Sequence, residues 1–113
     1  MKLDIVEHAN GALIVRLLGE LDRLSGPMFQ QMMQAAIGPK RRRVVVNLKG
    51  IDCLDSYNIA ILMSLRRAIE VQGASTIFVS DIAAIRHLLK IAGLQDDLAL
   101  AASEEEALAR QAK

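Results

Sequence analysis

The feature that most constrains the fold is an unbroken apolar segment at residues 44–48, which a long amphipathic pattern follows closely. The segment reads Val44, Val45, Val46, Asn47 and Leu48. A run of this kind is typical of a strand that is covered on both faces of a sheet. At residues 57–72 the apolar side chains recur at helical spacing, and Gly73 suits the position after a helix. A buried strand followed by a helix predicts an α/β domain.

Shorter patterns on both sides continue this alternation of strands and helices. The pattern predicts further strands at residues 3–8, 12–18, 75–79 and 98–101, and helices starting near residues 25, 82 and 104. Asn10-Gly11 is a hairpin signal between the first two strands. Asp81 is the expected N-cap of the third helix, and Ser103 with Glu106 the expected capping box of the last one. We expect residues 1–113 to form a single domain.

Charge and composition exclude several classes of protein. The chain has 14 basic and 13 acidic residues, so no net field draws it toward nucleic acid or an acidic membrane. Cys53 is the only cysteine, which excludes a disulfide framework and a cysteine-based zinc site. No segment approaches the roughly 20 apolar residues of a membrane span, and the N-terminus does not resemble a signal peptide. We expect a cytoplasmic protein that neither inserts into membranes nor binds nucleic acid directly.

The sequence also lacks the patterns that carry catalysis. There is no glycine-rich phosphate loop, and His8 and His87 do not have the spacing of metal ligands. Asp22 and Asp55 could be neighbours at one end of the sheet, but two carboxylates alone do not make an acid–base site. We therefore expect a protein that is not an enzyme and that needs no cofactor or metal.

Asp55-Ser56 stands at the turn between the apolar strand and the helix that follows it. The Ser56 hydroxyl could cap the helix by accepting a hydrogen bond from a backbone N–H of the first turn. It could also accept a phosphate, whose negative charge the helix N-terminus would favour. The residues alone favour the cap, and the two roles are compatible.

The helix at residues 57–72 has apolar side chains on two sides. The face expected in the core carries Ile61, Leu62, Leu65, Ala68 and Ile69. Ile59 and Met63 fall on the polar side, together with Arg66 and Arg67. Either these two apolar residues form a docking patch one turn from Ser56, or a neighbouring segment covers them.

Taken together, these segments resemble the STAS domain family, specifically its small single-domain anti-sigma factor antagonists. Gly19-Glu20-Leu21-Asp22 is similar to the family's G-x-L-D segment, and Leu54-Asp55-Ser56 to the start of its D-S-[ST]-G signature. The resemblance extends over nearly the whole chain. It implies a STAS fold, a mixed β-sheet with helices packed mainly on one face.

The resemblance also implies a role in partner switching. In such a switch, the unphosphorylated antagonist binds a serine-kinase anti-sigma factor, phosphorylation breaks the complex, and a PP2C-type phosphatase restores it. By this resemblance Ser56 is the phosphoacceptor, and Asp22 and Asp55 are its acidic neighbours. Ile59, Met63, Arg66 and Arg67 would then lie on the partner-binding surface.

Two residues depart from the family pattern directly after the expected phosphosite. Tyr57 replaces a Ser or Thr, and Asn58 replaces a Gly whose place it could fill in a left-handed conformation. Such a change suits an alternative role as a constitutive STAS subunit of a lipid-transport ABC system or of a stress-sensing scaffold. A nucleotide-hydrolysing role is a weaker alternative, because the chain has no phosphate loop.

Overall fold

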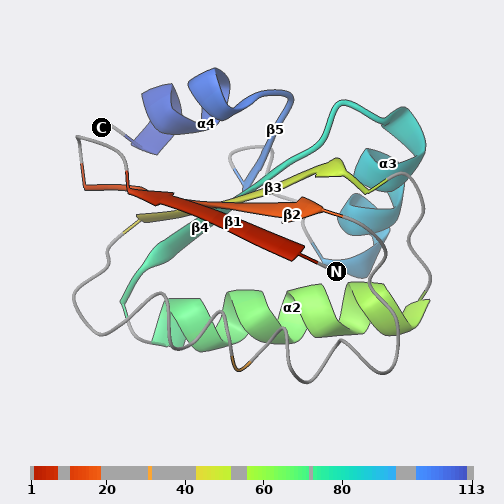
Figure 1. The fold of residues 1–113 in the computed structure, drawn as a ribbon. Coiled ribbons are helices and arrows are strands. Elements are labelled where there is room, and N and C mark those ends of the chain that lie inside the picture. Colours follow the sequence, from red (N-terminus) through yellow and green to blue (C-terminus); the bar gives the residue numbers. More distant parts are fainter. Residues whose placement is uncertain are drawn as a thin grey trace.

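The structure, a computed structural model, describes residues 2–7, 11–18, 31, 43–51, 56–71, 73–93 and 99–111. These residues build a five-stranded sheet with the strand order β1-β2-β3-β4-β5 (Figure 1). Strand β1 pairs antiparallel with β2, and each later strand pairs parallel with the one before it. The sheet is therefore mixed, as the resemblance to the STAS family implied.

The elements follow one another in the expected alternation. The strands are β1 (Lys2–Glu7), β2 (Leu13–Leu18), β3 (Arg43–Gly50), β4 (Ser75–Val79) and β5 (Leu100–Ala101). The described helices are α2 (Ser56–Val71), α3 (Ala83–Ala92) and α4 (Glu104–Gln111). Of the helix expected near residue 25, only Gln31 is among the described residues, and it is helical.

Helices cover both faces of the sheet, and two of the three described helices share one face (Figure 1). One face of the strands packs against α2 and α3 around Leu62, Leu65, Phe78 and Leu89, each at most 1% exposed. The opposite face packs against α4, where the fully buried Ala107 meets side chains of β2, β3 and β4. The helices thus lie mainly on one face, as the resemblance implied.

Strand β3 shows why the apolar run at residues 44–48 is unbroken. Val44 and Val46 belong to the core on the α2 side, whereas Val45 belongs to the core on the α4 side. All three side chains are completely buried. A strand in the middle of a sheet with helices on both faces needs apolar side chains at every position, and this is what the sequence supplies.

Two local predictions at helix starts have different outcomes. Helix α4 begins as expected, because the Ser103 Oγ accepts a hydrogen bond of 3.1 Å from the Glu106 N–H. The Asp81 prediction is wrong. Helix α3 has Ile82 as its N-cap residue without a side-chain cap bond, and Ser80 Oγ instead accepts a hydrogen bond of 3.2 Å from the Ile82 N–H. Asp81 faces Lys49, with 3.8 Å between its Oδ2 and the lysine Nζ.

Helix α4 is held to the sheet by a cluster of polar side chains as well as by Ala107. Glu104, the first residue of α4, accepts hydrogen bonds from Arg16 on β2 and from Asn47 on β3. Arg16 also pairs with Asp4 on β1 at 3.0 Å. The hydrogen bonds from Arg16 hold the pKa of the Glu104 carboxyl below its usual value, although burial acts in the opposite direction. The pKa of Arg16 is raised by the same contacts.

Candidate functional site

Ser56 is the first residue of α2, a few residues after the carboxyl end of β3. The helix begins one residue earlier than the sequence predicted, so the backbone N–H of Ser56 belongs to the first turn, whose donors have no partner within the helix. No acidic residue lies in that turn. The Ser56 side chain, Asp22 and Asp55 lie outside the described residues.

The two residues that depart from the family pattern, Tyr57 and Asn58, turn at least partly into the protein. Tyr57 is half-buried and packs against the core on the α2 side. Asn58 is 6% exposed. No described residue other than glycine has a positive φ, so the left-handed alternative for Asn58 is wrong, and this residue is helical. Asn58 therefore occupies the interior side of the first turn of α2.

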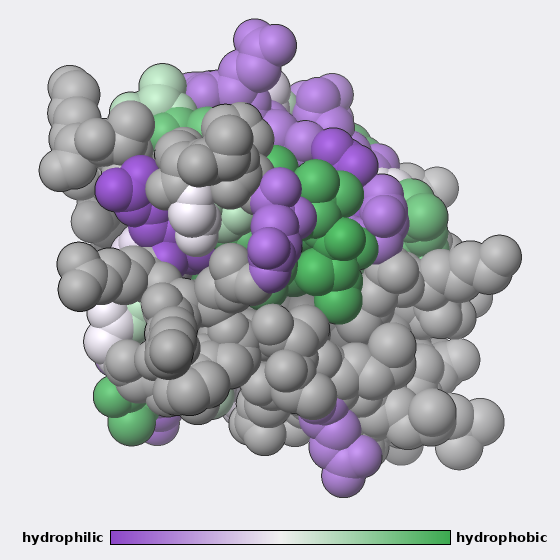
Figure 2. All heavy atoms as spheres, turned by 60° about the vertical axis from the view of Figure 1, so that its left-hand side comes forward, coloured by the Kyte–Doolittle hydropathy of each residue, from purple (hydrophilic) through white to green (hydrophobic). Residues whose placement is uncertain are grey.

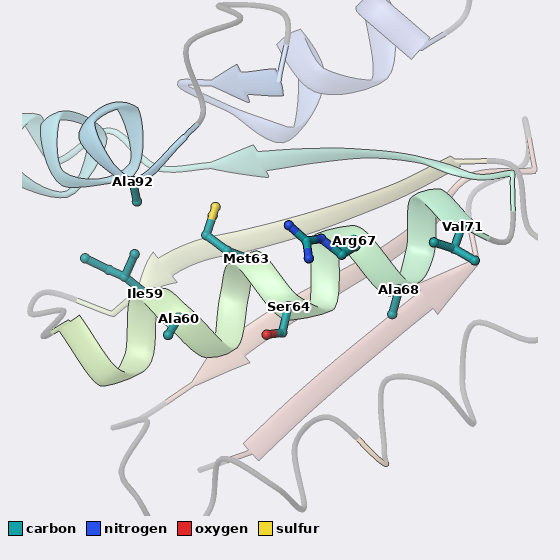
Figure 3. Close-up of a pocket in the computed structure, with 8 residues that line it drawn as sticks. All are labelled: Ile59, Ala60, Met63, Ser64, Arg67, Ala68, Val71 and Ala92. Atoms are coloured by element: carbon teal, nitrogen blue, oxygen red, sulfur yellow. The ribbon is translucent and has the colours of Figure 1, made fainter.

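Ile59 and Met63 lie between α2 and α3. Both side chains are half-buried and pack against the core on the α2 side. Figure 3 shows them extending from α2 toward the end of α3, where Ala92 lies. The structure thus places these residues at the border between core and surface, and partner binding by them stays a prediction.

A groove of about 810 Å³ runs along the exposed side of α2. The described residues that line it are mostly apolar, and they are Ile59, Ala60, Met63, Ser64, Arg67, Ala68, Val71 and Ala92. In Figure 3 the side chains of Ala60, Ser64 and Ala68 lie on the side of α2 that is turned away from α3. The groove therefore begins one turn after Ser56 and follows the helix to its last residue.

The two arginines of α2 differ in their contacts. Arg66 Nε lies 3.0 Å from Glu70 Oε1, one helical turn further on. Arg67 is exposed, and it forms no ion pair with any residue that the structure describes. Both arginines border a smaller hollow of about 290 Å³ with Met63 and Glu70. The groove thus contains one positive charge that the described part of the chain does not neutralise.

Comparison with known proteins identifies the family. The model of the STAS domain family matches residues 5–107. The chain belongs to the STAS domain family. It is 31% identical over 96 residues to the anti-sigma F factor antagonist of Paenibacillus polymyxa, and the match covers 83% of this chain and 82% of that protein.

Two solved structures share this STAS fold. An anti-sigma factor antagonist from Mycobacterium paratuberculosis superposes with a TM-score of 0.84 at 20% identity, covering 99% of this chain and 94% of that one. SpoIIAA of Bacillus in its phosphorylated form gives a TM-score of 0.73 at 21% identity, with 97% and 99% covered. At these identities the similarity shows a common architecture.

Only part of the groove of this STAS domain could be located from the sequence. Four residues expected in the core are buried, namely Ile61, Leu62, Leu65 and Ile69. Ala68, which we assigned to the same face, is half-buried and lines the groove instead. Ser64 and Val71 were missed altogether. The sequence feature that could have indicated this part of the groove is Val71, an apolar residue on the polar side of the helix. In the structure the Val71 side chain is 81% exposed.

The remaining surface of the STAS domain offers fewer candidates for chemistry. Among the residues that the structure describes, no group of three or more His, Cys, Asp or Glu side chains is placed to hold a metal ion. In the same part of the chain, no helix is long and apolar enough to cross a membrane. Figure 2 shows one face of the molecule, where hydrophobic groups reach the surface between hydrophilic ones. The groove beside α2 is therefore the candidate functional site of the described surface, and it adjoins Ser56.

Proposed function

We propose that this STAS domain is an anti-sigma factor antagonist whose binding to a serine-kinase anti-sigma factor is switched off by phosphorylation of Ser56. The observation that carries the proposal is the position of Ser56 as the first residue of α2, one turn before Ile59 at the start of the groove. The relative from Paenibacillus polymyxa, named as an anti-sigma F factor antagonist, supports the class of partner.

A phosphate at Ser56 would meet a favourable environment on its own chain. The N-terminus of α2 carries a partial positive charge, and no acidic residue of its first turn offsets that charge. The core contacts of α2 at Leu62, Leu65 and Ile69 lie in later turns. The fold would therefore tolerate the modification.

A partner seated on Ile59, Met63, Arg66 and Arg67 would meet a different environment. Phosphorylation adds about two negative charges at the edge of the contact, next in sequence to Asp55. An acidic or desolvated partner surface is repelled by such charges, so the complex dissociates while the domain stays folded. A PP2C-type phosphatase would reverse the change by removing the phosphate.

Incubation with the cognate serine kinase and ATP, followed by mass spectrometry, tests the phosphosite. We expect one phosphate on Ser56, which the Ser56→Ala variant lacks and the Ser64→Ala variant keeps. In calorimetric titrations with the kinase, Ser56→Asp should weaken binding at least about tenfold, a difference of about 1.4 kcal/mol. Ser75→Asp, at the opposite end of the parallel strands, is the control for an added charge. An unmodified Ser56, or equal binding by Ser56→Asp, refutes the switch.

A constitutive STAS subunit is the second candidate function, in a lipid-transport ABC system or a stress-sensing scaffold. The observation that favours it is the buried Asn58, which with Tyr57 makes the start of α2 bulkier than a Thr-Gly pair. A bulky first turn hinders the close approach that a kinase active site needs. Recovery of a transporter ATPase in place of a kinase, with Ser56 unmodified in cells, would favour this candidate.

A further inference from the structure

We infer that the second half of the groove is a docking surface for an amphipathic α-helix that carries an acidic side chain opposite Arg67. This distal surface consists of Ser64, Arg67, Ala68 and Val71. The inference rests on the proposed function in one respect, since the docked helix would belong to the regulatory partner of the STAS domain.

The lining of the distal surface is unusual for the solvent side of a helix. Such faces normally carry charged and polar residues. Here Val71 is 81% exposed, and Ala68 and Met63 border the same groove. The distal surface thus places two apolar side chains, Ala68 and Val71, beside the charge of Arg67, a combination that suits a contact surface.

The charges beside the groove select the chemistry of the occupant. Arg66 is paired with Glu70, whereas Arg67 has no ion pair with any described residue (Figure 3 shows its position in the groove). The net charge of these three residues is positive, so a second copy of the chain would bring a like charge to the interface. An acidic partner supplies the complementary charge instead.

The shape of the groove favours a helix over an extended segment. Among the residues that the structure describes, those lining the groove come from α2 and α3 and none from a strand, so this part of the lining offers no sheet edge for strand addition. From Ile59 to Val71 the groove follows the helix axis for about 18 Å. The distal surface, from Ser64 to Val71, takes up about 10 Å of that length, and two turns of a helix laid along α2 match it.

The distal surface lies too far from Ser56 to respond to its charge. Ser56 and Val71 are the two ends of the 16-residue α2, which places them about 22 Å apart along the axis. Charges in solvent are screened over about 8 Å at physiological ionic strength. The distal surface therefore contributes equally to partner binding in both phosphorylation states, and only the loss of contacts near Ser56 lowers the affinity of the whole complex.

Helical peptides of defined charge test the inference on the intact chain. The probe is a lactam-bridged peptide of about 8 residues with leucines on one face and one glutamate at their edge. The matched peptide carries lysine in place of the glutamate. Amide chemical shifts of the ¹⁵N-labelled protein locate the contact, and a titration of the shifts gives Kd.

We expect the glutamate peptide to shift the amides of Ser64, Arg67, Ala68 and Val71, and to bind about fivefold more tightly than the lysine peptide. Arg67→Glu should reverse this preference, whereas Lys49→Glu, at the end of β3, should leave it unchanged. Val71→Asp should abolish the shifts without changing the circular dichroism, since Val71 is exposed. Ser56→Asp should leave Kd unchanged within about twofold.

Three results would overturn the inference: equal binding of both peptides, shifts confined to another surface, or a protein dimer that Val71→Asp dissociates in sedimentation. The proposed function fails separately, when Ser56→Asp does not affect kinase binding. A distal surface that passes the peptide test would then stand without the phosphorylation switch.

Discussion

Arg16 and Glu104 are 88 positions apart in the chain, yet they form a bidentate ion pair that joins β2 to the first residue of α4. Arg16 Nε lies 2.8 Å from Glu104 Oε2, and Nη2 lies 2.9 Å from Oε1. Two parallel hydrogen bonds of this kind fix direction as well as distance. The pair therefore sets the position of α4 on the sheet.

Removal of the Glu104 carboxylate should destabilise the domain. Glu104→Ala leaves the side-chain N–H of Asn47 without this acceptor and leaves Arg16 with Asp4 alone, so we expect the free energy of unfolding to fall by about 2 kcal/mol. Urea denaturation followed by circular dichroism measures the change. Glu105→Ala removes the neighbouring, exposed carboxylate and should change stability by less than about 0.5 kcal/mol. Equal effects of the two variants would contradict the assigned role of the pair.

The same carboxylate should make stability depend on pH. In the folded protein the pKa of Glu104 lies below its usual value of 4.5, chiefly because Arg16 donates hydrogen bonds to it. The stabilisation is complete above that value and is lost as pH falls through the lower, folded-state pKa. Urea midpoints between pH 7 and pH 3 should therefore fall more steeply in the wild type than in Glu104→Ala. If the urea midpoints of the two proteins fell in parallel with pH, Glu104 would not be the source of the pH dependence.

Gly50 should tolerate no side chain. A Cβ built on Gly50 would lie 2.5 Å from the backbone oxygen of Leu17, at the place where the register between β2 and β3 shifts. Backbone cannot move aside cheaply, so Gly50→Ala should cost about 1 to 3 kcal/mol of unfolding free energy. Gly73→Ala is an informative comparison, because the space there is open and only its φ of 86° opposes the change. The loss at Gly73 should be smaller, about 1 kcal/mol.

Truncations of Leu62 and of Val71 should have different effects on stability, because these residues lie on the core side and on the groove side of α2. Leu62 is completely buried, and Leu62→Ala should lower the free energy of unfolding by about 2 to 5 kcal/mol. Val71→Ala, on the groove side of the same helix, should have an effect below about 0.5 kcal/mol. A comparable loss in Val71→Ala would mean that Val71 contributes to the core, and would remove it from the distal surface.

The strands and α2 could be predicted from sequence because their signals are local. The bounds of β4 match the prediction to the residue, and the unbroken apolar pattern of β3 identified a central strand. In α2, angular position alone placed Leu62, Leu65 and Ile69 in the core. Each of these inferences depends on the periodicity of side chains within one element.

The position of α4 and the extent of the groove depend on contacts between elements, which a single sequence does not reveal. Arg16 and Asn47 interrupt apolar strands, but nothing local indicates that both bind Glu104. Asp81 has the chemistry of a helix cap, yet the neighbouring Ser80 makes the bond to the backbone of Ile82. Ala68 lies at the edge of the core face, where its angular position on the helix does not decide whether it is buried.

The order of the strands in the sheet has a consequence for how the chain is synthesised. Since each strand after β1 is added beside the preceding one, the sheet can grow in the direction of translation without waiting for later segments. Helix α4 is the exception, because the partners of Glu104 on β2 and β3 leave the ribosome long before Glu104 does. Until α4 has left the ribosome, the part of the nascent sheet that α4 covers stays open to chaperones.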